Sequence, residues 1–271
     1  MKLLAFFAFV YCCFTSINVF GQTPKAIEDD LFQSYKMIEN WSESRDNHRY
    51  VYDIQRKAND SLDKANTLFG KKLKYYTGKY PFTITQKFSS FAQNPDSITK
   101  DKVQIVTSVD GNFRIYSWDV RSDGSEYGFD NVIQYRVGNK TISMYIDDPV
   151  FNGEHLYVYY YDKLYTLKAG NKTYYLALYS GAYTHIEVGK GLQVFDIENG
   201  KLNNDVKIIR TPTGMHSQLY YEFLFEGTKY EDINYDVDSK TISIPVILKD
   251  TATKKRIIYK FTGQYFEGVK N

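Results

Sequence analysis

The chain has 271 residues, and its 34 basic and 32 acidic side chains leave a net charge of +2. This near balance excludes a strongly basic nucleic-acid-binding domain and a highly charged disordered tail. The 2 Trp, 26 Tyr and 18 Phe supply enough apolar rings for a large hydrophobic core.

The first 21 residues have the features of a signal peptide. A basic start precedes an almost wholly apolar run over residues 3–14, and Val19 and Gly21 suit a peptidase cut before Gln22. The apolar run is shorter than the ~20 residues that a transmembrane helix needs. A short N-terminal anchor helix is the alternative. We therefore expect residues 22–271 to be exported, with no transmembrane segment in the mature chain.

Both cysteines, Cys12 and Cys13, lie in this N-terminal segment. We therefore expect a mature chain without disulfides, thiolate-bound zinc or iron–sulfur clusters. None of the four histidines shares a metal-ligand spacing with another. The sequence accordingly predicts neither a metal site nor a cofactor.

The spacing of apolar residues predicts two amphipathic helices between Thr23 and Phe69. Thr23 can cap the first helix, and Pro24 fits its first turn. The polar run 42–47 separates the apolar positions of the two helices, and one continuous helix is the alternative. We expect Gly70 to end the second helix.

From Val103 onward the apolar pattern has the period of two that is typical of strands. The Asp110-Gly111 turn predicts a hairpin in which Thr107 pairs with Arg114. Further tight turns follow at short intervals and predict consecutive antiparallel strands. These turns are expected at Gly138-Asn139, Asn152-Gly153, Gly170-Asn171, Asn199-Gly200, Asp238-Ser239 and Asp250–Thr253.

These patterns predict a mainly β protein, with an antiparallel meander or sandwich preceded by an N-terminal α-helical segment. A small or incomplete β-propeller is the alternative, since the segment 192–202 is similar to a turn of a propeller blade. However, the sequence shows no repeat of about 40 residues, which a propeller would normally have. The predicted parts are a signal peptide over 1–21, a helical segment and linker over 22–100, and an antiparallel β domain over 101–271.

Motifs for catalysis are not found in the sequence. There is no Gly-x-Ser-x-Gly elbow, and Ser180-Gly181 is interpreted as a loop after a strand. The stretch 189–191 is too short for a phosphate-binding loop and is interpreted as a segment before a strand. We therefore predict no catalytic residue.

Carboxylates and aromatic rings are clustered after the hairpin and predict a ligand site for sugars. Aromatic faces can stack on sugar rings, and carboxylates accept hydrogen bonds from hydroxyl groups; a solvated loop with its rings in the core is the alternative. A hydrolase that uses Asp119 with Asp123, Glu126 or Asp130 is a second hypothesis, because glycosidases need two facing carboxylates. The candidate ligand-binding residues are Trp118, Asp119, Arg121, Asp123, Glu126, Tyr127 and Asp130.

Basic residues are in excess from Arg56 to Lys87, and tyrosines lie among them. Such a pattern favours contact with an anionic polymer or a lipid headgroup surface. A solvated helix end whose aromatic side chains pack against the sheet is the alternative. The candidate residues for an anionic surface are Lys71, Lys72, Lys74, Tyr75 and Tyr76.

Four stretches carry a resemblance to known proteins: 113–119, 129–135, 172–176 and 260–266. Together they resemble a group of uncharacterised exported proteins of Bacteroidota-type Gram-negative bacteria. The resemblance implies a location in the periplasm, at the cell surface or outside the cell, and it implies no activity. We therefore expect an exported envelope protein with a non-catalytic binding or assembly role, whose partner is an envelope glycan or an envelope protein and not a nucleic acid.

Overall fold

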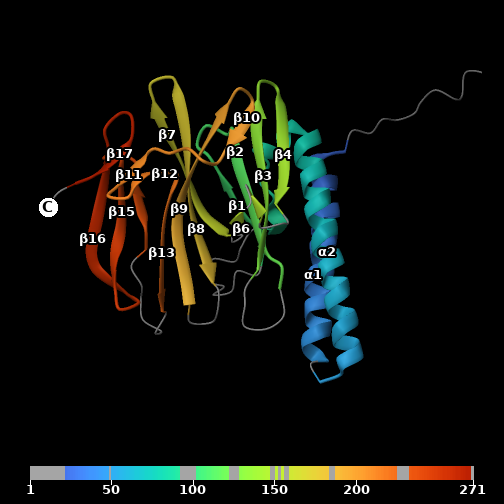
Figure 1. The fold of residues 1–271 in the computed structure, drawn as a ribbon. Coiled ribbons are helices and arrows are strands. Elements are labelled where there is room, and N and C mark those ends of the chain that lie inside the picture. Colours follow the sequence, from blue (N-terminus) through green and yellow to red (C-terminus); the bar gives the residue numbers. More distant parts are fainter. Residues whose placement is uncertain are drawn as a thin grey trace, which may run out of the picture.

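The computed structural model describes residues 22–48, 50–91, 102–121, 128–146, 150–151, 154–155, 159–182, 187–224 and 232–269. In this part of the chain, two helices precede strands that form three stacked sheets and a small hairpin (Figure 1). The layers run from the helices through a first and a middle sheet to a last sheet. The mainly β class with N-terminal helices is thus confirmed.

The two predicted helices are present, and they run antiparallel to each other (Figure 1). They are α1 (Pro24–Asn47) and α2 (Tyr52–Lys79). The hydroxyl oxygen of Thr23 accepts a hydrogen bond from the backbone N–H of Ala26 at 3.2 Å, which is the predicted N-cap. Two short 3-10 turns follow, η1 (Pro81–Ile84) and η2 (Ser89–Phe91). The apolar stripes of α1 and α2 face the first sheet.

The first sheet is an antiparallel meander in the order β1-β2-β3-β4. Thr107 lies opposite Arg114 across the Asp110-Gly111 turn, so the predicted register is confirmed. Its strands are β1 (Gln104–Thr107), β2 (Phe113–Asp119), β3 (Phe129–Val137) and β4 (Lys140–Ile146), and the small hairpin of β5 (Val150–Phe151) and β6 (Glu154–His155) follows.

The middle sheet has the order β10-β9-β8-β7, and β13 also pairs with β9. All its pairs are antiparallel. The turns at Gly170-Asn171 and Asn199-Gly200 join its strands as predicted. The strands are β7 (Tyr160–Ala169), β8 (Lys172–Ala182), β9 (Glu187–Glu198), β10 (Lys201–Asn203) and β13 (Gln218–Leu224).

The last sheet has the order β12-β11-β17-β16-β15-β14. Its pairs are antiparallel except that β11 and β17 run parallel. The strands are β11 (Ile209–Thr211), β12 (Gly214–His216), β14 (Asn234–Asp236), β15 (Thr241–Leu248), β16 (Thr251–Phe261) and β17 (Phe266–Gly268).

A hydrophobic core fills each space between two layers. Phe69 and Trp118 belong to the core between the helices and the first sheet. Phe113 and Tyr175 stack at 4.8 Å between the first and middle sheets. Ile242 belongs to the core between the middle and last sheets. Because every sheet packs face to face on the next layer, the described strands form a stack, and they do not close into a barrel or propeller.

The predicted end of the second helix is wrong. Gly70 lies inside α2, which continues to Lys79. A Cβ atom at Gly70 would lie 2.5 Å from Cε2 of Tyr145 on β4. Glycine is therefore required at this position because the tyrosine ring approaches the helix backbone closely, and it does not act as a helix stop.

Two segments interpreted as lying outside strands are parts of the middle sheet. Ser180-Gly181 belongs to β8, and residues 189–191 belong to β9. A Cβ atom at Gly191 would lie 2.6 Å from Cε2 of Tyr179, so this glycine makes room for a ring on the neighbouring strand. The pairing places Lys190 opposite Ser180, and its ammonium group donates to the serine hydroxyl at 2.9 Å.

Candidate functional site

Trp118, the predicted sugar-stacking residue, lies in the core under the helices. Its exposed fraction is 0%, and its Nε1–H donates to the Asn66 side-chain oxygen of α2 at 3.1 Å. Phe69 packs against the indole edge-to-face at 4.9 Å, and the Tyr145 ring stacks on it at 5.9 Å. The indole faces are therefore occupied by protein and are not available to a ligand.

Asp119 and Arg121 form a corner between the end of β2 and α1. An Asp119 carboxylate oxygen accepts a hydrogen bond from the Arg121 backbone N–H at 2.7 Å. The Arg121 carbonyl in turn accepts one from the buried Arg45 guanidinium of α1 at 2.5 Å. Burial raises the pKa of Tyr35, which lies beside them, to about 12, although the Arg121 charge opposes this shift. The corner thus ties the first sheet to α1.

The two described carboxylates of the predicted site do not face each other as a pair. Asp130 lies opposite Trp118 in the register, and it accepts a hydrogen bond from the Tyr145 hydroxyl at 2.7 Å. Asp119 lies opposite Phe129 and belongs to the α1 corner. The other predicted members, Asp123, Glu126 and Tyr127, lie outside the described residues. A hydrolase that pairs Asp119 with Asp123 or Glu126 therefore stays a hypothesis.

The predicted anionic-surface residues on α2 fall into two groups. Lys72 and Tyr76 point to α1, where both donate to Asp30 at 2.8 Å, and Tyr76 is 7% exposed. Lys71, Lys74 and Tyr75 are exposed, and Tyr75 has an exposed fraction of 53%. The second group is therefore the one available to a partner, whereas Lys72 and Tyr76 link the two helices.

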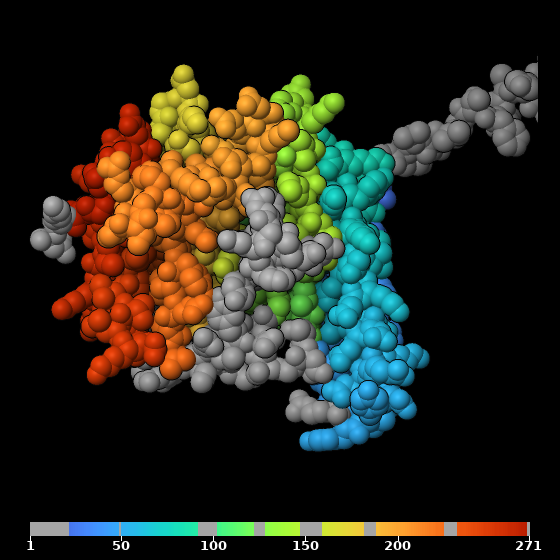
Figure 2. Space-filling view, viewed as in Figure 1, coloured from blue at the N-terminus to red at the C-terminus, as the bar shows by residue number. Residues whose placement is uncertain are grey.

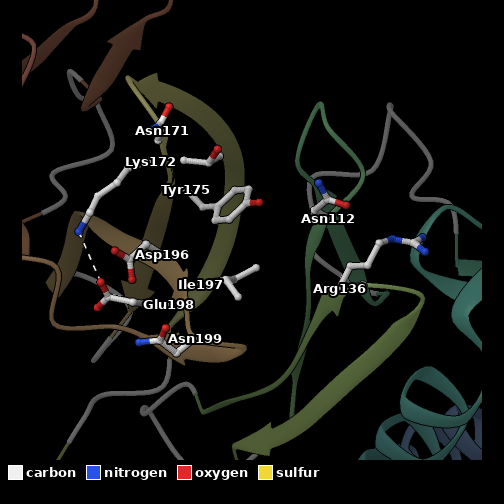
Figure 3. A pocket seen from close by; sticks show the side chains of 11 residues that line it. Asn112, Arg136, Asn171, Lys172, Tyr175, Asp196, Ile197, Glu198 and Asn199 are labelled. Carbon is white, nitrogen blue, oxygen red and sulfur yellow. Dashed lines mark ion pairs between the residues drawn. The ribbon is translucent and has the colours of Figure 1, made fainter.

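A polar cleft that could not be predicted from the sequence lies where the first and middle sheets end. The volume of the cleft is about 450 Å³. Four turns of the two meanders meet at this end and contribute four of the lining residues, and the adjoining ends of β3, β8 and β9 supply the others (Figures 1 and 3). Its lining residues are Asn112, Arg136, Gly138, Asn171, Lys172, Thr173, Tyr175, Asp196, Ile197, Glu198 and Asn199.

The cleft extends around the tip of the middle sheet. Figure 3 shows the side chains of Tyr175 and Ile197 pointing toward the first sheet, while Asp196 and Glu198 lie on the opposite face, as alternation along β9 requires. Arg136 borders the cleft with its stem, and its guanidinium turns away from the middle sheet. The charged groups that a ligand in the cleft could contact therefore belong to the tip of the middle sheet.

Those charges are an ion pair and a buried carboxyl group. Lys172 and Glu198 lie 3.6 Å apart and have side-chain exposures of 59% and 58%. Asp196 is 5% exposed, and its Oδ1 has no hydrogen-bond partner among the described residues. Burial raises the pKa of Asp196, against the opposing hydrogen bond from Asn203. The tip thus presents both donors and acceptors.

The walls of the cleft are held in place by contacts between the two sheets. The Tyr175 hydroxyl donates to Asp110 in the β1–β2 turn at 3.0 Å. Gly200, in the β9–β10 turn, lies so close to Val137 of β3 that a Cβ atom would be 3.2 Å from its Cγ1. These contacts join the first and middle sheets directly at the cleft.

One sequence signal for this cleft existed. In a meander, alternate turns lie at the same edge of a sheet, so the turns at Asp110, Gly138, Gly170 and Asn199 belong to one end of their sheets. What could not be deduced was that the first sheet would pack on the middle sheet with these ends together.

Within the described residues, no group of three or more His, Cys, Asp or Glu side chains could hold a metal ion. No helix among the described elements is long and apolar enough to span a membrane. No protein-family model matches the chain, and neither a curated protein nor a solved structure matches it.

Proposed function

We propose that the chain is an exported protein of the Gram-negative envelope that binds a glycan, without chemical conversion, in the cleft at the tip of the middle sheet. Export rests on the signal-like features of residues 1–21. The choice of a glycan as the ligand rests on one observation, the polar cleft of about 450 Å³. This volume lies within the range of roughly 300–1,000 Å³ that is typical of ligand sites.

The lining residues fit a ligand rich in hydroxyl groups. Asn112, Asn171 and Asn199 each carry an amide that can donate and accept hydrogen bonds. Lys172 adds donors and Glu198 adds acceptors at the rim. A sugar hydroxyl also donates and accepts, so neighbouring hydroxyls can be bound by such a set.

The test is binding of the mature protein to a panel of envelope-type oligosaccharides by calorimetry. A Lys172→Met/Glu198→Gln variant removes the charged groups of the tip, and each lost charged hydrogen bond is worth about 1.5–3 kcal/mol. We expect Kd to rise at least tenfold. The matched control is Lys207→Met/Asp205→Asn, since this ion pair is 3.2 Å long, has exposures of 59% and 54%, and lies outside the cleft.

Two results would contradict the proposal. One is that no oligosaccharide of the panel binds. The other is that the tip variant binds as tightly as the wild type, which would place the ligand elsewhere. Both double variants should keep the wild-type unfolding temperature, because exposed ion pairs contribute little to stability.

A protein partner is a second candidate, and the tip of the helical hairpin favours it. Tyr50, Val51 and Tyr52 are exposed there by 95%, 47% and 75%. The hairpin extends beyond the sheets, so this apolar tip stands clear of the body (Figures 1 and 2). Exposed apolar groups that gather in one place are typical of interaction sites.

A photo-crosslinking residue at position 52 tests this candidate in intact cells. We expect one discrete adduct with an envelope protein, which disappears when Tyr50 is also replaced by Ser. The same residue at position 254, an exposed lysine of β16, is the control. The absence of an adduct at position 52, or the same adduct at both positions, would exclude a partner at the hairpin tip.

A further inference from the structure

One face of α2 combines lysines with apolar side chains in an exposed row. Lys64, Leu68, Lys71, Tyr75 and Lys79 follow one another at steps of four, three, four and four residues, so they share one face of the helix. All five are exposed, with fractions of 42% for Leu68 and 53% for Tyr75. We call these five residues the lysine stripe. It is about 22 Å long at the helical rise of ~1.5 Å per residue.

The lysine stripe carries an excess of positive charge, and Asp60 lies one turn before its first member, Lys64. No acidic residue occurs between Lys64 and Lys79. On α1, Asp29 is paired with Lys25, Asp30 with Lys72 and Glu39 with Lys36. Lys64 and Lys71 form no ion pair with any residue that the structure describes.

The tyrosine of the stripe is held in an exposed position. The Lys79 ammonium donates to the Tyr75 hydroxyl at 2.6 Å and lies 5.0 Å from the ring centroid. The Tyr75 ring also contacts the Tyr76 ring edge-to-face, with 5.4 Å between the ring centroids. The ring therefore projects from the helix together with its cationic neighbour.

We propose that the lysine stripe docks the protein on an anionic lipid surface. Each lysine close to such a surface contributes roughly fivefold to partitioning. Tyr75 and Leu68 fit the same partner, because tyrosine and aliphatic side chains enter the boundary between headgroups and acyl chains. A soluble polyanion would bind the lysines but would offer no apolar region for Leu68. This inference is independent of the glycan proposal, since the cleft and the stripe share no residue.

The test is co-sedimentation of the mature protein with vesicles. One set contains phosphatidylcholine alone, and the other contains equal parts of phosphatidylcholine and phosphatidylglycerol. We expect binding to the second set only, and weaker binding as the salt concentration increases. The variant Lys64→Gln/Lys71→Gln/Lys79→Gln should partition about 100-fold less, since three lysines are lost. Leu68→Ser/Tyr75→Ser should weaken binding without changing its salt dependence.

Two further variants distinguish docking from the effects of net charge and misfolding. Lys254→Gln/Lys255→Gln/Lys260→Gln removes the same charge from exposed lysines of β16 and should bind like the wild type. The triple Lys→Arg variant of the stripe should also bind, because it keeps the charge. Equal loss in the β16 variant, or equal binding to both vesicle types, would overturn the proposal. Retention on dextran sulfate without vesicle binding would also overturn it and would assign the stripe to a soluble polyanion.

Discussion

Gly70 offers a sharp test of how the helices fit on the first sheet. In an isolated helix, Gly70→Ala would stabilise by about 1 kcal/mol because alanine has the higher helix propensity. Here the new methyl group would lie 2.5 Å and 2.7 Å from Cε2 and Cε1 of Tyr145. Carbon atoms cannot approach so closely, so the ring or the helix must shift.

The cost of that shift follows from what the ring contacts. Overpacking of this kind costs about 1–3 kcal/mol. The ring also stacks on Trp118, and its hydroxyl donates to Asp130 at 2.7 Å, a type of bond worth about 1.5–3 kcal/mol. When the hydrogen bond is lost and the propensity gain is subtracted, we expect Gly70→Ala to lower the free energy of unfolding by about 1.5–5 kcal/mol.

Urea denaturation of the mature protein, followed by tryptophan fluorescence, measures this difference. Gly78→Ala on the same helix is the matched control, since its Cβ would meet the Ser143 side chain at an ordinary 3.6 Å. We expect this control to stay within about 1 kcal/mol of the wild type. In a Tyr145→Ser background the ring is gone, so Gly70→Ala should become neutral or stabilising. A Gly70→Ala variant that is more stable than the wild type would refute the reasoning.

Two other predictions concern buried polar groups. Asn66→Ala removes the amide that bonds both the indole N–H of Trp118 and the carbonyl of Val120. We expect the free energy of unfolding to fall by about 2–4 kcal/mol, measured by thermal denaturation. An unfolding midpoint equal to that of the wild type would contradict this role of the amide. Burial alone would raise the pKa of Glu28, but hydrogen bonds, including one from the Ser90 backbone N–H at 2.6 Å, lower it below its usual 4.5. The unfolded chain then binds more protons in acid, so this contribution to stability is present above about pH 4.5 and is lost as the pH falls through the lower folded pKa. The Glu28→Gln variant should therefore be less stable than the wild type at neutral pH. Its urea midpoint should also decrease less as the pH is lowered. If the urea midpoints of variant and wild type depend on pH equally, Glu28 does not contribute to the acid sensitivity.

Local physical chemistry made the elements of this chain predictable from the sequence. The Thr23 cap and the apolar spacing define the start of α1, because both depend only on residues within a few positions of each other. The Asp110-Gly111 turn sets the hairpin register, since the conformation of the turn determines which residues face each other. The mainly β class follows from a series of such turns.

The tertiary structure determines whether a given side chain lies in the core, in an ion pair or in solvent. Trp118 is a core residue because α2 covers its strand, and no local pattern indicates which face of a strand a helix will cover. Lys71 and Lys72 are adjacent on α2, yet they have different surroundings. Lys72 forms an ion pair with Asp30 of α1, whereas Lys71 is exposed to solvent. The polar cleft exists because two separate sheets stack with their turns at the same end. Packing between distant segments is set by the sum of many weak contacts, so it could be read only from the folded molecule.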